Sequence, residues 1–423
     1  MENIIATMKW SGIDYDEGPH KEGDCGPYIQ SQRNDLYKKH AQELIEKGSA
    51  YYCFCTSERL EEVRKKQTEQ KLPPMYDRHC RNLSPEEVKE KLNAGTPHVI
   101  RQKIPLMGDV KIHDLVRGEV LFNTRTLDDH VLVKSDGFPT YHLANIVDDH
   151  YMRISHVIRG EEWLPSAPRH VLLYEAFGWQ PPVFAHLPLL LNPDRTKLSK
   201  RQGYVAVEDY RDKGFLPDAL VNFIALLGWN PGTEQEIFSL QELTDLFSFE
   251  HVHKAGAIFD TEKLKWMNAQ YIKKLSLDDV TNACIPVLQS AGFAVDDRER
   301  VKRVVHAVRT HLHSFADITE YAKPFFVNDV VPESDEAAAM VKDEKHKKVF
   351  SALLDALQSM DAVSEENFMP AMKQAGAAAG VKGKELYMPV RIALTGQQHG
   401  PELPLVASAL GKEEVVRRIT KYL

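Results

Sequence analysis

The chain has 423 residues, of which 43% are hydrophobic and 27% charged, a composition typical of a globular protein with roughly two to four domains. Its net charge of −8 argues against nonspecific coating of nucleic acid, but leaves open the binding of one folded RNA by local basic faces. No apolar run reaches the roughly 18–20 residues that span a bilayer, and five cysteines in so long a chain argue against a disulfide framework. We therefore expect a cytoplasmic protein that does not enter a membrane.

The first segment with a clear pattern is helical. Ile4, Ile5 and Met8 fall on one side of it, and Gly12 ends the pattern. Neither an N-cap residue nor a strand precedes it. Two interpretations stay open, a helix entered part-way and a frayed N-terminal helix.

Residues 50–140 combine helical and extended patterns, which predicts a mixed α/β insert. Within it, Ser84 followed by Pro85 is typical of an N-cap and the first residue of a helix. Helices are expected at 33–48, at 57–71 and from Pro85 onward, and strands at 51–55, 98–105 and 118–143.

From residue 141 helical and extended patterns alternate, and each predicted strand is an apolar run bounded by turn residues. This βαβ pattern predicts a buried parallel sheet. Helices are expected at 141–152 and 165–179, and strands at 154–160 and 181–191.

After about residue 205 the pattern becomes mostly helical and stays so to Leu423. The polar residues 331–345 predict an exposed joint between two helical units. The sequence therefore predicts an α/β part followed by an all-α part. The 3.6-residue period is clearest in 217–228, 300–322 and 340–358.

Two lysines follow the last predicted buried strand. Lys197 and Lys200 stand in the polar segment NPDRTKLSKRQG, residues 192–203. Ligands of open α/β sheets bind beyond the carboxyl ends of the strands, so ammonium groups at this point are placed to neutralise a polyphosphate. The alternative is a solvated basic loop.

A pair of polar side chains is expected on the helix that begins at residue 141. Tyr141 and Asn145 stand four residues apart and so share one face of that helix. A phenol and an amide together make a small recognition surface. The alternative is a core tyrosine and a helix-capping asparagine.

Arg159 ends a predicted strand at the same edge of the sheet. A guanidinium suits a carboxylate because two of its N–H groups match the two oxygens. Glu161 and Glu162 follow as candidate partners of a ribose hydroxyl or a cation, and Trp163 is a candidate wall of an amino-acid pocket. The alternative for Arg159 is an ordinary salt bridge at a strand end.

Three of the five cysteines, Cys53, Cys55 and Cys80, lie close together in the sequence. Structural zinc takes four tetrahedral S or N ligands, and the spacing alone leaves the fourth open between neighbours such as His79 and Tyr76. The alternative is two half-buried strand cysteines and a third that is unrelated to them.

Together these stretches resemble glutamyl-tRNA synthetase, a class I aminoacyl-tRNA synthetase, from the first residue to the last. The motifs agree with the family in order and spacing, and the helical last third is less distinctive. They are MKWSGIDYDEGP, GPYIQSQR, YYCFC, YDRHCR, KSDGFPTYHLANIVDDH, HVIRGEEWLPSAPRHVLLYEAFGW, FAHLPLLLNPDRTKLSKRQG and FIALLGWNP. The resemblance implies ATP-dependent attachment of glutamate to tRNA through glutamyl-adenylate, with Mg²⁺ accompanying ATP.

The resemblance also implies roles for single residues. KLSKR, residues 197–201, stands at the family's KMSKS loop, so Lys200, supported by Lys197, is the expected catalytic contact to the ATP phosphates. The backbone at Leu189 and Leu190 is expected to contact adenine. The expected glutamate contacts are Tyr141, Asn145 and Arg159, with Arg159 on the side-chain carboxylate and Trp163 beside the pocket.

Zinc-bearing members of the family match this chain at three cysteines. Their usual fourth ligand stands two residues after the last cysteine, where this chain has Asn82, a poor zinc ligand. Some relatives use a tyrosine four residues before that cysteine, and Tyr76 stands there. The resemblance therefore implies a structural zinc site made of Cys53, Cys55, Tyr76 and Cys80.

The resemblance divides the chain into four parts and implies tRNA, glutamate and ATP as partners of a monomer. The parts are a partial Rossmann-like nucleotide-binding fold over 1–35 and 141–191, an acceptor-binding insert over 36–140, a stem-contact domain with the KLSKR loop over 192–276, and a helical anticodon-binding domain over 277–423.

Family members begin with a strand and a phosphate-binding signature, the HIGH motif, and neither occurs in these 423 residues. We therefore expect an N-terminally truncated form that is inactive by itself, because class I catalysis positions ATP and the amino acid with both signatures. One alternative is a non-catalytic tRNA-binding remnant, and another is an enzyme that also charges tRNA for glutamine. Glutaminyl-tRNA synthetase ends in β-barrels, and the shortened relative that modifies an anticodon base lacks the C-terminal domain, so both agree less well with this chain.

Overall fold

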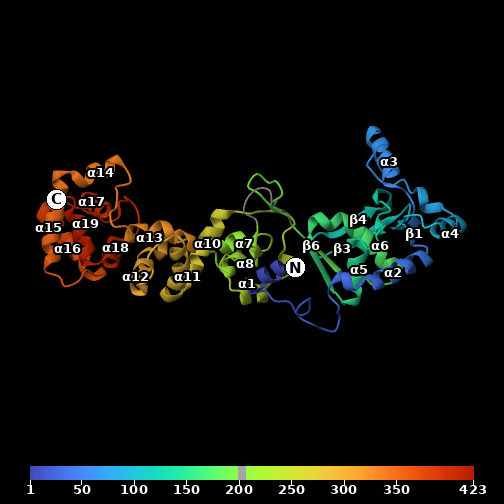
Figure 1. The fold of residues 1–423 in the computed structure, drawn as a ribbon, viewed down its shortest axis with the longest axis horizontal. Coiled ribbons are helices and arrows are strands. Elements are labelled where there is room, and N and C mark those ends of the chain that lie inside the picture. Colours follow the sequence, from blue (N-terminus) through green and yellow to red (C-terminus); the bar gives the residue numbers. More distant parts are fainter. Residues whose placement is uncertain (199–205) are drawn as a thin grey trace.

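The structure is a computed structural model, and it describes residues 1–198 and 206–423. Figure 1 shows an elongated molecule with an α/β part at one end and a purely helical part at the other, while the N-terminus lies near the middle. The predicted fold class, α/β followed by all-α, is confirmed. Within the described residues, no helix is both long enough and apolar enough to cross a membrane.

The largest sheet has four strands, in the order β4 (Gly118–Asn123), β3 (Asp109–Asp114), β7 (Val183–Leu187) and β6 (His156–Gly160). β6 and β7 pair in parallel along their whole length, and β3 adds one parallel pair to β7. β3 and β4 form an antiparallel hairpin. The predicted parallel pairing of the strands after residue 141 is therefore confirmed for β6 and β7. β3 and β4 lie before that segment, and they are antiparallel because a short turn joins them.

Three helices share one hydrophobic core with this sheet: α2 (Asn34–Glu46), α5 (Tyr141–Tyr151) and α6 (Ala167–Phe177). Leu143, Leu173 and Phe184 are among the side chains buried there. Each such side chain contributes about 1.5–3 kcal/mol relative to leaving it exposed. The core fixes α5 and α6 against β6 and β7, and these four elements deliver most of the polar side chains described below.

A second, antiparallel sheet consists of β1 (Ala50–Cys53), β2 (Val99–Gln102) and β5 (Val131–Val133). α3 (Ser57–Glu69) and α4 (Pro85–Asn93) lie with β1 at the end of the molecule opposite the purely helical part (Figure 1). The predicted start of α4 is confirmed, because the Ser84 hydroxyl accepts from the Glu87 N–H and the Glu87 carboxylate accepts from the Ser84 N–H.

The predicted strand over 181–191 is wrong as a single strand. β7 ends at Leu187, and Pro188, which has no N–H to donate to a ladder, separates it from β8 (Leu190–Leu191). β8 pairs in parallel with β9 (Ala257–Ile258) in a separate sheet. The segment that leads into Lys197 therefore leaves the main sheet and joins the helical unit that follows.

That unit contains the helices α7 (Val207–Asp212), α8 (Pro217–Leu226), α9 (Leu240–Leu246) and α10 (Thr261–Lys274). Phe223 and Met267 lie in its core, and Trp10 at the end of α1 (Glu2–Trp10) packs against it. The expected helix at the start of the chain is therefore present, and its apolar contacts are with residues far along the sequence.

The remaining chain is helical around one large core. Most of the expected joint at 331–345 is exposed, but Asp335–Lys342 within it forms a helix that buries Ala337 and Val341 completely. The helices are α11 (Leu277–Ser290), α12 (Arg298–Val308), α13 (Ile318–Phe326), α14 (Asp335–Lys342), α15 (Glu344–Gln358), α16 (Glu365–Ala379), α17 (Lys384–Thr395), α18 (Leu403–Leu410) and α19 (Lys412–Thr420).

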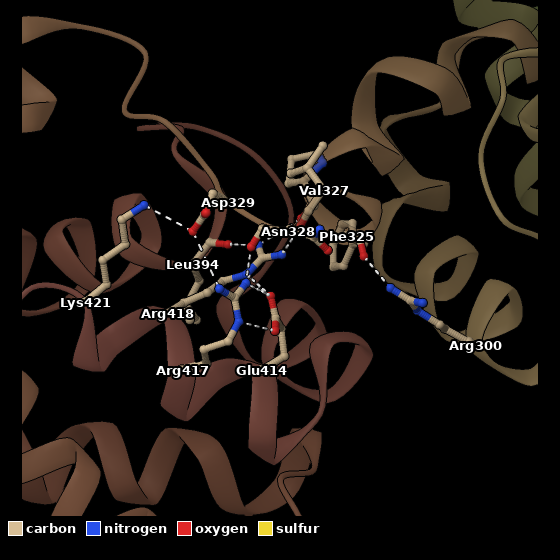
Figure 2. Close-up of polar contacts among 11 residues, drawn as sticks. Arg300, Phe325, Val327, Asn328, Asp329, Leu394, Glu414, Arg417, Arg418 and Lys421 are labelled. Atoms are coloured by element: carbon tan, nitrogen blue, oxygen red, sulfur yellow. Dashed lines mark hydrogen bonds and ion pairs between the residues drawn. The ribbon is translucent and has the colours of Figure 1, made fainter.

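Arg418 on α19 is the polar link that holds several of these helices together (Figure 2). Its buried guanidinium donates to the carbonyls of Pro324 and Val327 at the end of α13 and to the carbonyl of Leu394 at the end of α17. It also pairs with Glu414, 2.6 Å away. Helix C-termini leave carbonyls without partners inside the helix, so one cation here satisfies groups from two of them.

Replacing this cation will destabilise the helical part of the molecule. Arg418→Leu leaves the carbonyls of Pro324, Val327 and Leu394 without this donor, at a cost of about 3–5 kcal/mol, while Glu414 keeps its contacts with Arg417. The matched control is Lys421→Leu, which removes an exposed ion pair with Asp329 and is expected to cost less than about 1 kcal/mol. Calorimetry of both variants measures the difference, and equal melting temperatures would contradict the role of Arg418.

Candidate functional site

Arg159 lies at the carboxyl end of β6 and is half-buried. Its Nη1 donates to Nδ1 of His170 at 3.2 Å, and its guanidinium carbon lies 5.8 Å from the centre of the Tyr141 ring. Among the described residues, no carboxylate forms an ion pair with it. Arg159 therefore forms no ordinary salt bridge in this part of the chain, although its charge lowers the pKa of the Asp149 carboxyl against the effect of burial.

Tyr141 and Asn145 stand on one face of α5, as predicted. The alternative of a core tyrosine and a helix-capping asparagine does not agree with the structure. Tyr141 is 45% exposed, so it is not a core residue. Asn145 is buried inside the helix, whose caps are Thr140 and Met152, and neither amide atom has a hydrogen-bond partner among the described residues. An unsatisfied buried amide costs about 1–3 kcal/mol, which a ligand that bonds it recovers.

Trp163 is brought to the same place by the short 3₁₀ helix η4 (Glu161–Ser166), which directly follows β6. Its ring centre lies 4.9 Å from that of Tyr141, with the two planes tilted by 54°. The two partly exposed aromatic rings therefore form one wall, and the guanidinium of Arg159 is the cation beside it.

Lys197 also reaches this region. Its Nζ lies 3.1 Å from Oε1 of Glu162, one residue before Trp163. Leu191 and Lys197 form an antiparallel bridge across a tight turn, so the lysine is held by β8. Lys200, the other lysine of the KLSKR segment, lies outside the described residues.

The two leucines expected to contact adenine lie immediately before this turn. The carbonyl of Leu189 accepts from the Ala257 N–H at 3.0 Å, and that of Leu190 accepts from the Leu198 N–H at 2.9 Å. The first bond fixes the backbone that precedes Lys197 against β9, and the second closes the turn that contains Lys197. The adenine contact itself stays a prediction.

Arg117 is a residue that the sequence analysis did not single out. It follows β3 in the hairpin turn, and its guanidinium donates to the carbonyls of His186 at 3.1 Å and Lys254 at 2.7 Å. Its Nη2 also lies 2.6 Å from Oε2 of Glu161. One side chain thus joins the main sheet, the η4 segment beside Arg159 and the helical unit after β8. No local pattern signals such a role, because its three partners are distant in the sequence.

The predicted metal-ligating residues come together in the second sheet. The Sγ atoms of Cys53, Cys55 and Cys80 all lie within 4.8 Å of one another. The Tyr76 hydroxyl is 3.3 Å from the sulfur of Cys53 and 3.4 Å from that of Cys55. Thiolates bound tetrahedrally to zinc at about 2.3 Å stand about 3.8 Å apart, so this donor set fits the ion. The alternative of unrelated cysteines is wrong.

Cations surround this cluster. Nη1 of Arg59 lies 3.5 Å from the sulfur of Cys55, and the guanidinium of Arg101 lies 4.0 Å above the Tyr76 ring. The Phe54 N–H donates to the sulfur of Cys80 at 3.4 Å. Positive charge and N–H donors around sulfur favour the thiolate, the form that binds a metal.

Comparison with known families assigns nearly the whole chain. Residues 1–266 match the catalytic domain of class I tRNA synthetases for glutamate and glutamine (E and Q), and residues 270–423 match an anticodon-binding domain. The fold and the site therefore define a class I aminoacyl-tRNA synthetase.

Individual relatives narrow the class. The glutamate–tRNA ligases of Alkaliphilus metalliredigens and Clostridioides difficile are 46% and 45% identical to this chain over 99% of its length, and the matches cover 87% and 88% of those proteins. A crystal structure of a glutamate–tRNA ligase from Elizabethkingia meningosepticum in complex with its amino acid superposes with a TM-score of 0.89 at 37% identity, covering all of this chain and 88% of that one. The chain belongs to the glutamate–tRNA ligases, and the predicted resemblance is confirmed.

Proposed function

We propose that the site around Arg159 binds glutamate and ATP and that the chain ligates glutamate to tRNA. The observation that supports this most directly is the half-buried guanidinium of Arg159, which forms no ion pair within the described residues. The unsatisfied amide of Asn145 and the aromatic wall of Tyr141 and Trp163 lie on the elements next to it. A small ligand with a carboxylate and further polar groups suits these side chains together.

In this proposal the side-chain carboxylate of glutamate forms paired hydrogen bonds with Arg159, because the fork of the guanidinium matches two oxygens. Asn145 offers a donor and an acceptor to the remaining polar groups of the ligand. Tyr141 and Trp163 exclude water from one side of the pocket. The charge of Arg159 favours glutamate over its uncharged amide.

ATP is placed on the other side, where Lys197 meets its phosphates and the backbone of Leu189 and Leu190 faces adenine, and the family's motif alone assigns a phosphate contact to Lys200, which lies outside the described residues. The α-carboxylate of glutamate attacks the α-phosphorus, pyrophosphate leaves, and the tRNA terminal hydroxyl then attacks the adenylate carbonyl and releases AMP. Mg²⁺ bound with ATP neutralises phosphate charge. The lysines stabilise the charge that develops on the leaving group, and the ion pair of Lys197 with Glu162 gives way to the phosphates.

The shape of the molecule supports the proposed contacts with tRNA. The insert, the stem-contact region and the helical anticodon-binding region follow one another along the long axis in Figure 1. We assign them to 36–140, 192–276 and 277–423, as expected from the sequence. An elongated monomer of this kind suits an elongated RNA, and we propose that it works in the cytoplasm.

We also propose that Cys53, Cys55, Tyr76 and Cys80 hold a structural Zn²⁺. Zinc would cross-link β1 to the segment around Cys80, where the described residues form only a small hydrophobic cluster. Arg59 and Arg101 would balance the negative charge of three thiolates and a phenolate. The ligands are far from Arg159 in the sequence. Cys53 belongs to the three-stranded sheet, whereas Arg159 belongs to the four-stranded sheet, so the role we propose for the ion is structural.

Arg159→Ala is expected to raise the dissociation constant of L-glutamate at least about 100-fold, because it removes a charged, paired contact. Asn145→Ala should raise it by about tenfold, since one or two neutral hydrogen bonds are lost. Arg153→Ala, an exposed arginine before β6, is the control and should leave binding unchanged. Isothermal titration calorimetry gives the constants. Unchanged binding in Arg159→Ala would refute the proposed site.

Metal analysis of the purified chain should find one zinc per molecule. Cys80→Ala should abolish it, and Tyr76→Phe should lower zinc affinity by roughly 10–100-fold if the phenol is a ligand. Cys25→Ala, a half-buried cysteine outside the cluster, is the control. Full zinc content in Tyr76→Phe with unchanged affinity would mean that Tyr76 is not the fourth ligand.

A further inference from the structure

A chain of hydrogen bonds lies behind Arg159. His170 on α6 is completely buried, and its Nδ1 lies 3.2 Å from Nη1 of Arg159. Its Nε2 lies 3.0 Å from Nδ1 of His142 on α5. The ring of His130 meets the ring of His142 edge-on, with the centres 4.7 Å apart. None of these histidines is used in the proposed reaction.

The chemistry of the partners fixes where the protons are. A guanidinium only donates hydrogen bonds, so Nδ1 of His170 must carry a lone pair. The proton of a neutral His170 then sits on Nε2, and it is donated to Nδ1 of His142. His142 in turn carries its own proton on Nε2. Arg159 and His142 together therefore select one tautomer of a neutral His170.

We propose that His170 is a positioning residue, which holds the guanidinium of Arg159 in place for the side-chain carboxylate of the amino acid without forming an ion pair that would compete with it, and that His142 locks the tautomer that makes this possible. The inference rests on the proposed glutamate-binding role of Arg159. It adds a determinant of specificity that touches no substrate.

An acidic side chain in the place of His170 would bind Arg159 more strongly, but it would neutralise the charge that the substrate needs. Two acidic groups of α5 lie in the surroundings, and neither forms an ion pair with Arg159 in the described residues, although the charge of Arg159 lowers the pKa of Asp149 against the effect of burial. The carboxylate of Asp148 accepts from Nε of Arg33 at 2.7 Å and from the Tyr37 hydroxyl at 2.8 Å. Asp149 forms no ion pair with Arg159 in the described residues, and burial raises its pKa to about 6. A neutral imidazole orients the guanidinium without competing for it.

The surroundings keep His170 neutral. The charged groups that face it are Arg159 on β6 and Arg169 on its own helix, and the other titratable neighbours are His142 and His130. Burial, reinforced by these cations, lowers the pKa of His170 well below its ordinary value. Burial also lowers the pKa of His142. The acceptor at Nδ1 is therefore present throughout the neutral range.

The test compares two substitutions in the same chain. Glutamine at position 170 offers a carbonyl acceptor to Arg159 and an amide donor to His142, as the neutral imidazole does, whereas leucine offers neither. His170→Gln is expected to bind L-glutamate within about threefold of the unsubstituted chain. His170→Leu should weaken binding about tenfold or more and should lower the preference for L-glutamate over L-glutamine.

Each outcome decides something. If Arg159→Ala binds glutamate as well as the unsubstituted chain, the proposed function fails at this site. If Arg159→Ala weakens binding and His170→Leu does not, the inference about His170 is overturned while the proposed function stands. Equal weakening by His170→Gln and His170→Leu would mean that His170 acts only through packing, and would also overturn it.

A second measurement reads the tautomer of His170 in the unsubstituted chain. In the chain labelled with ¹⁵N-histidine, the resonances of His170 are identified by their loss in His170→Gln. They should show an unprotonated Nδ1 and a protonated Nε2, and the Nδ1 signal should shift in Arg159→Ala. A protonated Nδ1 would overturn the inference.

Discussion

The positive charge of Arg159 is the constraint on which the site depends. A guanidinium that is partly withdrawn from water loses hydration, and proteins normally compensate with a carboxylate. Here the described residues supply a neutral imidazole from His170 and the face of the Tyr141 ring. Asp148, on the same helix as Tyr141, is engaged by Arg33 and Tyr37. The charge is held in one orientation and remains available to an anion that enters from solution.

The fold delivers this arrangement through elements that share one core. β6 ends at the residue after Arg159, α5 presents Tyr141 and Asn145, and α6 presents His170. The segment after β6 is fixed by ion pairs with partners from two other regions, Glu161 with Arg117 and Glu162 with Lys197. The turn between β3 and β4, the end of β6 and the turn after β8 thus meet beside Arg159, where we propose the amino-acid pocket. A substitution that breaks one of these ion pairs is therefore expected to change the position of the segment beside Arg159.

Local signals in the sequence predicted much of this. The cap at Ser84, the helix that begins at Tyr141 and the strand that ends near Arg159 all depend on interactions within a few residues. The cysteine cluster was predicted by the resemblance, and the fit of Tyr76 beside three sulfurs agrees with it.

The features that were missed depend on contacts distant in the sequence. β3 has an alternating pattern that was visible, but its pairing with β7 follows from the whole sheet. The strand ends before Pro188, and the residues after it pair with β9, which lies far along the sequence. Within the polar segment 331–345, Asp335–Lys342 forms a helix because tertiary packing buries Ala337 and Val341. The roles of Arg117 and His170 exist only once separate elements have come together.

The most direct test of the central claim is a crystal structure of the chain with L-glutamate bound. We expect the side-chain carboxylate to form two hydrogen bonds of about 2.8 Å with the guanidinium of Arg159, with His170 still bonded behind it and the Asn145 amide bonded to the ligand. A structure in which Arg159 pairs with a carboxylate of the protein, or in which glutamate binds elsewhere, would contradict the account.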